Sequence, residues 1–192
     1  MIRHLSNRNA ASLGQLDWIF QDLAGRVMSR LDYIKLDPAR IVDCGSGRGI
    51  DRDLLAKKFP EAQLIELDLA LETLKLRQEP IQGILSKLFK KSTAPTLLCA
   101  DANHLPLANA SIDFAYANLL LPYISDIPAF IRELRRVLNI GGAFCVSGLG
   151  VDSFKELRAL GLSSYRFPDM HDIGDMCIDV GFSNPVVDTE YI

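Results

Sequence analysis

The sequence is short of the features that mark several classes of protein. Its four cysteines are scattered, and none forms a C-x-x-C pair. Lysine and arginine number 21 against 24 acidic residues, so no excess of positive charge points to nucleic acid. No apolar run reaches the roughly 18 residues that a membrane helix needs, and the N-terminus has no apolar signal-peptide core. We therefore predict a cytoplasmic protein with reduced cysteines and without nucleic-acid or membrane partners.

The length and composition fit one domain of an ordinary globular protein. A chain of 192 residues can bury one sizeable core but is too short for two domains of usual size. Apolar residues make up 48% and charged residues 23%, which excludes a disordered or fibrous chain. We predict a single domain over 1–192, with a helical N-terminal segment at 1–36, a ligand-binding core at 37–148 and a substrate-side segment at 149–192.

Apolar periodicity predicts strands that alternate with helices. Steps of three and four residues mark helices, and short apolar runs bounded by turns mark strands. Helices are expected at 15–36, 50–58, 70–78, 128–138, 152–160 and 169–180. Strands are expected at 40–43, 62–67, 96–100, 112–119, 143–147 and 186–191, with a turn at Gly141-Gly142 before the fifth. This order is typical of βαβ units, so we predict an α/β, Rossmann-like fold: a mostly parallel, twisted sheet with helices on both faces.

The turn after the first strand indicates a class of ligand. Residues 41–49 read I-V-D-C-G-S-G-R-G, and glycines at such a turn expose backbone N–H groups where a helix begins. The dinucleotide fingerprint would need glycine at Ile50, and Gly49 comes one residue too early. The Asp43 carboxylate would repel a pyrophosphate but would pair with an ammonium group. Although glycine turns serve many purposes, a ligand with an amino-acid end and a nucleoside end fits better: S-adenosylmethionine.

Polar residues also follow the next three predicted strands. Open α/β sheets bind ligands at the carboxyl ends of their strands, where these residues would meet. Asp68 lies near the spacing of a ribose ligand, Asp101 would accept a bond from an adenine amino group, and Asn118 would lie beside the methionine part. Taken singly, Asp68 and Asp101 fit helix capping equally well. The predicted cofactor-binding residues are Asp43, Gly45, Ser46, Gly47, Asp68, Leu69, Asp101, Ala102, Asn118 and Leu119.

These motifs resemble those of a known family. The glycine turn, the strand-end residues and the L-N-I-G-G run at 138–142 resemble class I S-adenosylmethionine-dependent methyltransferases. Within that class, nearly all of the chain is similar to the biotin-synthesis malonyl-carrier-protein O-methyltransferases, the BioC family. The segments that carry this narrower resemblance are 105–113, 118–119, 154–158 and 169–175, the last of which reads D-M-H-D-I-G-D.

The resemblance implies methylation of the free carboxylate of a malonyl thioester, on acyl carrier protein or on coenzyme A. That carboxylate is already ionised at pH 7, so we expect no catalytic acid or base and no metal. Arg158, Arg166 and His171 are candidates to bind it, and Tyr123 is a candidate to line the methyl-transfer pocket. Each has a structural alternative: solvated arginines, a capping histidine and a tyrosine packed in the core.

Residues 79–95 form a basic insertion in the predicted core. Lys87, Lys90 and Lys91 lie beside leucine and phenylalanine residues. They would either steer an acidic carrier protein towards the site or form the solvated face of a short helix. The sequence leaves both interpretations open.

Two departures from the family keep other functions open. Leu13 and Gly14 stand where the family has Tyr-Asp, which helps to cover the cofactor. The sequence also stops before the family's antiparallel C-terminal strand, which we expect to be missing. Either the chain is a shortened form, or 186–191 pair differently, for example with a second copy of the chain, as a homodimer, across an open sheet edge. These departures favour a shortened, catalytically impaired member that binds adenosylmethionine or assists assembly. A third alternative is the related arginine hydroxylase of respiratory complex I assembly, which would need an oxidant and a metal.

Overall fold

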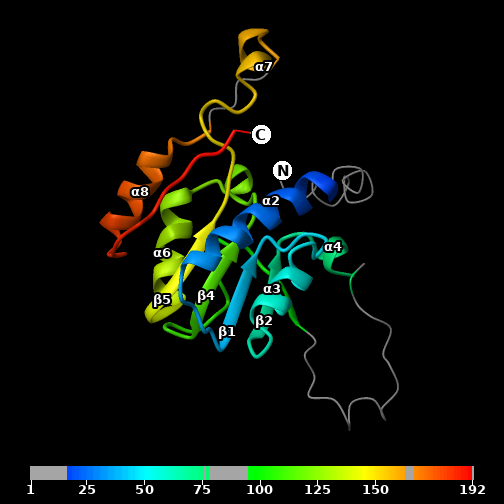
Figure 1. Ribbon diagram of the computed structural model, residues 1–192, viewed down its shortest axis with the longest axis vertical. Coiled ribbons are helices and arrows are strands. Elements are labelled where there is room, and N and C mark those ends of the chain that lie inside the picture. The colour runs from blue at the N-terminus through cyan, green and yellow to red at the C-terminus, as the bar shows by residue number, and fades with distance from the viewer. Residues whose placement is uncertain (1–16, 76, 78–94, 163–166, 192) are drawn as a thin grey trace.

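A five-stranded parallel sheet forms the centre of the molecule (Figure 1). The computed structural model describes residues 17–75, 77, 95–162 and 167–191. The strands lie in the order β3-β2-β1-β4-β5, and every pair of neighbours is parallel. Their bounds are β1 Arg40–Cys44, β2 Gln63–Asp68, β3 Thr96–Cys99, β4 Ile112–Ala117 and β5 Leu138–Val146. The predicted Rossmann-like architecture is confirmed.

Each predicted helix has a counterpart in the described chain. The α-helices are α2 Asp17–Arg30, α3 Arg52–Lys58, α4 Leu71–Lys75, α6 Ile127–Val137, α7 Lys155–Ala159 and α8 Met170–Asp179. Two single 3-10 turns, Leu31–Tyr33 and Leu121–Tyr123, follow α2 and β4. The predicted helix 15–36 is thus shorter than expected. The basic insertion with Lys87, Lys90 and Lys91 lies outside the described residues.

Helices cover both faces of the sheet because its strands are apolar on both sides. On one face, Val42 and Ala115 pack with Phe130 and Leu134 of α6, and α8 lies beside that helix. On the other face, Phe114 and its neighbours pack against residues of α2 and α3. Figure 1 shows α2 crossing this face of the sheet. Strands buried on both faces are typical of parallel sheets.

The predicted start of the fifth strand is wrong. We expected a Gly-Gly turn followed by a strand at 143–147, but β5 begins at Leu138, directly after α6. Ile112 faces Leu138 while Phe114 faces Ala143, so extra residues of β5 bulge out between these two pairs. Gly141 has φ +80°, which a bulge of this kind requires and which glycine adopts without a steric penalty.

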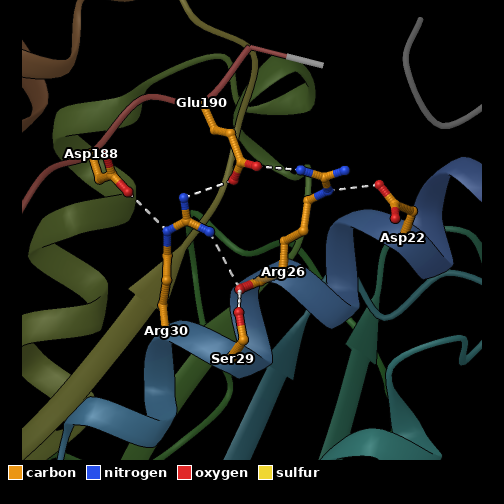
Figure 2. Close-up of polar contacts among 6 residues, drawn as sticks. All are labelled: Asp22, Arg26, Ser29, Arg30, Asp188 and Glu190. Carbon is orange, nitrogen blue, oxygen red and sulfur yellow. Dashed lines mark hydrogen bonds and ion pairs between the residues drawn. The ribbon is translucent and has the colours of Figure 1, made fainter.

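The predicted last strand is also wrong. In the described chain, 186–191 belong to no strand; they form an extended segment that lies against α2. Arg30 donates to Asp188 at 2.9 Å and to Glu190 at 2.8 Å, and Arg26 pairs with Glu190 (Figure 2). Ionic contacts, rather than strand pairing, therefore hold this segment. No helix within the described ranges is long and apolar enough to span a membrane.

Candidate functional site

A cavity of about 280 Å³ opens at the carboxyl ends of the strands. The loops after four neighbouring strands meet there, as parallel topology requires. Nine of the ten predicted cofactor-binding residues line it: Gly45, Ser46, Gly47, Asp68, Leu69, Asp101, Ala102, Asn118 and Leu119. The structure thus brings together residues that are up to 74 positions apart in the sequence, from Gly45 to Leu119.

The glycine turn has a backbone conformation that other residues rarely adopt. Gly45, Gly47 and Gly49 all have positive φ, at +73°, +50° and +77°. Space is restricted as well. A Cβ on Gly45 would lie 2.6 Å from Leu120 Cδ1, and one on Gly49 would lie 2.6 Å from Arg77 Nη2. Both conformation and packing therefore require glycine at these two positions.

Asp68 and Asp101 make capping contacts and line the cavity at the same time. The Asp68 carboxylate accepts bonds from the backbone N–H of Gly47 at 2.8 Å and of Ala70 at 2.7 Å. Asp101 accepts from the N–H of Asn103 at 2.9 Å. A carboxylate oxygen can accept more than one bond, so these contacts leave capacity for a ligand. The two interpretations of these aspartates are compatible.

Asp43 is the predicted residue that does not line the cavity. Its side chain is buried, in register with Glu66 on one side and Tyr116 on the other. Burial, followed by the charges of Asp51 and Glu66, raises the pKa of Asp43 well above its ordinary value. A buried carboxyl group that lies beneath the turn and does not line the cavity is a poor partner for a ligand ammonium group.

Asp51, which the sequence analysis missed, is the carboxylate that lines the cavity near Asn118. Its Oδ1 accepts bonds from Tyr116 Oη at 2.8 Å and Asn118 Nδ2 at 3.2 Å. Burial raises the pKa of Asp51 above its ordinary value, although these two hydrogen bonds act in the opposite direction. Asp51 stands at the N-cap position of α3, where aspartate is common, but its side chain makes no capping bond. From its sequence position Asp51 would be expected to cap α3, whereas its contacts place it with Asn118 on the wall of the cavity.

The first described helix covers one side of the cavity. Asp17 and Phe20 of α2 line it, and Asp17 pairs with Arg48 of the glycine turn at 3.5 Å. Leu13 and Gly14, which replace the Tyr-Asp pair that helps to cover the cofactor in the family, lie outside the described residues. Phe20 belongs to the apolar stripe of the predicted helix, which was the available signal for its position.

A buried ionic network lies beneath the glycine turn. Glu66 is fully buried; it pairs with Arg77 and, at 2.6 Å, with Arg52. Arg77 Nη1 also donates to Gly47 O at 2.8 Å and Ser46 Oγ at 3.0 Å. Because one guanidinium contacts both β2 and the turn, the network fixes the turn relative to the sheet.

The four predicted substrate-binding residues do not form one cluster. Tyr123 lines the cavity and is half exposed. Arg158 lies on α7, donates to the carbonyls of Val151 and Ser153, and does not line the cavity. His171 is exposed at the start of α8, with its backbone N–H bonded to Asp169, as expected for a residue in a capped first turn. Arg166 lies outside the described residues.

Comparisons with known proteins agree with this geometry. The methyltransferase domain family matches residues 42–146. The malonyl-[acyl-carrier protein] O-methyltransferase of Gallionella capsiferriformans is 44% identical over 181 residues, covering 90% of this chain and 61% of that protein. The enzymes of the same name from Laribacter hongkongensis and Nitrosospira multiformis are 39% and 32% identical, with all of this chain matched to 66% and 67% of theirs. The chain thus spans about two thirds of the length of these relatives.

Solved structures share the fold at low sequence identity. A chain of the complex between the Haloferax volcanii Trm112 methyltransferase activator and a putative methyltransferase superposes with a TM-score of 0.71 at 18% identity, over 94% of this chain and 76% of that one. A possible histamine N-methyltransferase of Thermotoga maritima gives 0.70 at 19% identity, over 94% and 81%.

Proposed function

The chain belongs to the class I S-adenosylmethionine-dependent methyltransferases, and from this premise we propose that it transfers a methyl group to the free carboxylate of a malonyl thioester. The relatives named malonyl-[acyl-carrier protein] O-methyltransferase support the thioester of an acyl carrier protein as substrate, in biotin synthesis. The observation that carries the proposal is the cavity in which the residues after four strands converge.

The charges of the cavity suit S-adenosylmethionine. Four aspartates and one arginine line it: Asp17, Asp51, Asp68, Asp101 and Arg48. The cofactor carries a sulfonium and an ammonium group against one carboxylate, so an excess of acidic side chains attracts it. A pyrophosphate in the same place would be repelled.

Each part of the cofactor has a partner on the cavity wall. Asp68, at the end of β2, would accept bonds from the ribose hydroxyls, and Asp101 with Ala102 would border the adenine. Asn118 and Asp51 would hold the methionine part, with the Asp51 carboxylate near its ammonium group. This assigns to Asp51 the role that the sequence suggested for Asp43.

Orientation is the main task of the protein in this reaction. The bound cofactor supplies an activated methyl group, and the malonyl carboxylate is ionised at neutral pH, so no side chain has to remove a proton. Leu119, Leu120 and Ile124 present apolar surface at the end of β4 and exclude water there. Holding the reacting atoms in line in this way can supply roughly 7–11 kcal/mol of the barrier.

Among the described residues, fewer of the predicted substrate-binding residues than of the predicted cofactor-binding residues line the cavity. Tyr123, at the rim of the cavity, is the predicted substrate-binding residue that the geometry supports. Direct binding by Arg158, Arg166 or His171, steering by the lysines of 79–95, a homodimer, a single domain and a cytoplasmic location remain predictions. The alternative of a cofactor-binding protein without turnover is decided by the experiment below.

Two measurements on the full chain test the proposal. Calorimetric titration with S-adenosylmethionine should show binding that Asp68→Ala weakens at least tenfold, since a buried ligand hydroxyl would lose its acceptor. Label from methyl-labelled cofactor should then appear on malonyl carrier protein but not on acetyl carrier protein, which has no free carboxylate. Failure of the folded chain to bind the cofactor would overturn the proposal. Binding without methyl transfer would favour the non-catalytic alternative.

A further inference from the structure

The chain has an unfavourable backbone conformation where β4 enters the cavity. Leu119 has φ +54°, in the left-handed region that a branched, non-glycine residue rarely occupies. Asn118, Leu119 and Leu120 form a corner that lines the cavity on the side where the methionine part of the cofactor would lie. Residues held in such a conformation require strong local support.

Ser147, the residue after β5, supplies that support. Its backbone N–H donates to Ala117 O at 2.9 Å. Its Oγ accepts a bond from the N–H of Leu119 at 2.9 Å and donates to Asn118 Oδ1 at 2.7 Å. The hydroxyl thus acts as both acceptor and donor, and a methyl group can do neither. Ser147 is not among the described residues that line the cavity.

The hydrogen bonds continue from Ser147 to the cavity wall in one direction. Ser147 Oγ accepts a bond from the N–H of Leu119, so its own proton points to Oδ1 of the Asn118 side-chain amide. The NH2 group of that amide then faces Asp51. Tyr116 donates to the same Asp51 oxygen. Each donor group therefore points along the series towards Asp51, and the hydrogen bonds in such a series polarise one another. The orientation of the Asn118 amide depends on Ser147.

The corner also shapes the glycine turn. Leu120, which follows the strained residue, packs so closely on Gly45 that a Cβ there would lie 2.6 Å from Leu120 Cδ1. If the Leu119 backbone relaxed, Leu120 would move off the turn and the Asn118 amide would lose its fixed direction. Both changes would fall on the side of the cavity formed by the residues after β4 and β1, whereas Asp68 and Asp101 lie at the ends of β2 and β3.

We propose that Ser147 is a positioning residue for methyl transfer: it holds the corner of Asn118, Leu119 and Leu120 in the conformation that aligns the reactive end of the cofactor. The proposal rests on the proposed function. It predicts a loss in kcat with little change in cofactor affinity, because the adenine and ribose partners lie on β2 and β3. A misplacement of about 1 Å can lower a rate on the order of a hundredfold.

The test compares three variants of the full chain. Ser147→Ala should bind S-adenosylmethionine within about threefold of wild type but lose roughly 10- to 100-fold in kcat towards malonyl carrier protein. Ser147→Thr keeps the hydroxyl and should retain most of the rate. Leu119→Gly placed in the Ser147→Ala background should recover part of it, because glycine adopts positive φ without the serine bond.

A matched control and a second measurement separate this idea from the proposed function. Ser111→Ala removes a hydroxyl that bonds only locally, to Ala108 O, and should change nothing. Amide hydrogen exchange at Leu119 should be slow in wild type and Ser147→Thr and at least tenfold faster in Ser147→Ala, whether or not the chain methylates anything. Unchanged exchange, or an active wild type whose Ser147→Ala variant keeps full kcat, overturns the positioning role. Absent cofactor binding by wild type overturns the proposed function and, with it, a role of Ser147 in methyl transfer, whereas the exchange rates still decide whether Ser147 holds the corner.

Discussion

Two ionic networks in this molecule use the same kinds of side chain in opposite surroundings. Beneath the glycine turn, Glu66 is fully buried and its partner Arg77 is 6% exposed. Between the C-terminal segment and α2, Arg30 and Asp188 are 42% and 58% exposed. In the buried network Glu66 and Arg77 have lost nearly all their water and depend on their partners. In the exposed network, water replaces a side chain that is removed. A simple count of ion pairs would assign the two networks similar contributions to stability. Their surroundings make the loss of a partner costly in the buried network and nearly neutral in the exposed one.

The networks also differ in what they position. The buried one contacts the glycine turn directly, through bonds from Arg77 to Gly47 O and Ser46 Oγ. The exposed one reaches the cavity only through α2, whose far end carries Asp17 and Phe20 (Figures 1 and 2). Loss of the first should therefore remove both stability and ligand binding, whereas loss of the second should alter neither by much.

The largest effect is expected from breaking the buried network. Glu66→Ala leaves two arginines without their carboxylate, which should lower the free energy of unfolding by about 3–5 kcal/mol. Urea denaturation measures this, and calorimetry should find cofactor binding lost. Replacing Glu66 and Arg77 together by methionine should cost less than Glu66→Ala, since no unpaired charge remains at that pair. If Glu66→Ala lowered the free energy of unfolding by no more than the loss of an exposed ion pair does, the two networks would not differ in their contribution to stability.

The next effect comes from the contact between Arg77 and the turn. Gly49→Ala forces a Cβ against the guanidinium at positive φ, so we expect a loss of roughly 1–3 kcal/mol in urea denaturation and weaker cofactor binding. Gly25→Ala is the control in the other region. Gly25 is exposed on α2 with nothing within 4 Å of a new Cβ, and alanine there should stabilise by about 0.5–1 kcal/mol.

A pH-dependent effect should follow from Asp43. Its pKa is raised in the folded state, so its favourable contribution is complete below its unfolded pKa of about 4 and is lost as pH rises towards the folded value. The side chain of the Asp43→Asn variant cannot ionise, so the variant should not lose stability in this way as the pH rises. The Tm of wild type minus that of the variant should therefore fall steadily as the pH rises above about 4. A difference that stays constant with pH would show that Asp43 is not protonated in the folded protein.

The smallest effect is expected at the exposed network. Arg30→Ala should leave the Tm within about 2 °C of wild type. Raising the salt concentration to about 1 M, where the screening length is about 3 Å, should abolish even that difference. The Glu66→Ala deficit should persist in the same buffer, because buried charges are screened far less. Equal salt sensitivity of the two variants would contradict the comparison.

Local patterns were sufficient to predict most of the fold and the cofactor side of the site. The glycine turn and the polar residues at strand ends are short-range signals, and parallel topology brings them to one edge. Asp51, Arg77 and Ser147 gave no such signal, because their roles depend on which strands are neighbours. Asp51 meets Asn118 across 67 positions, and Ser147 meets Asn118 only because β5 lies beside β4.

The errors have physical causes as well. The glycines at 141–142 were interpreted as a turn, but a bulge lets β5 continue through them. Residues 186–191 alternate like a strand, yet Val186 and Tyr191 are exposed, and the acidic residues between them bind α2 instead. The alternation of apolar residues in this segment gives no sign that arginines of α2 will bind its acidic side chains in place of strand pairing.

The contact between Arg26 and Glu190 joins positions 164 residues apart. Contacts of such separation close late, because nearly the whole chain must be in place before they form. During synthesis α2 leaves the ribosome before every strand of the sheet, yet it acquires its last partners only after residue 190 has followed. The helix that covers one side of the cavity is therefore made first but receives its last ionic contacts only near the end of the described chain.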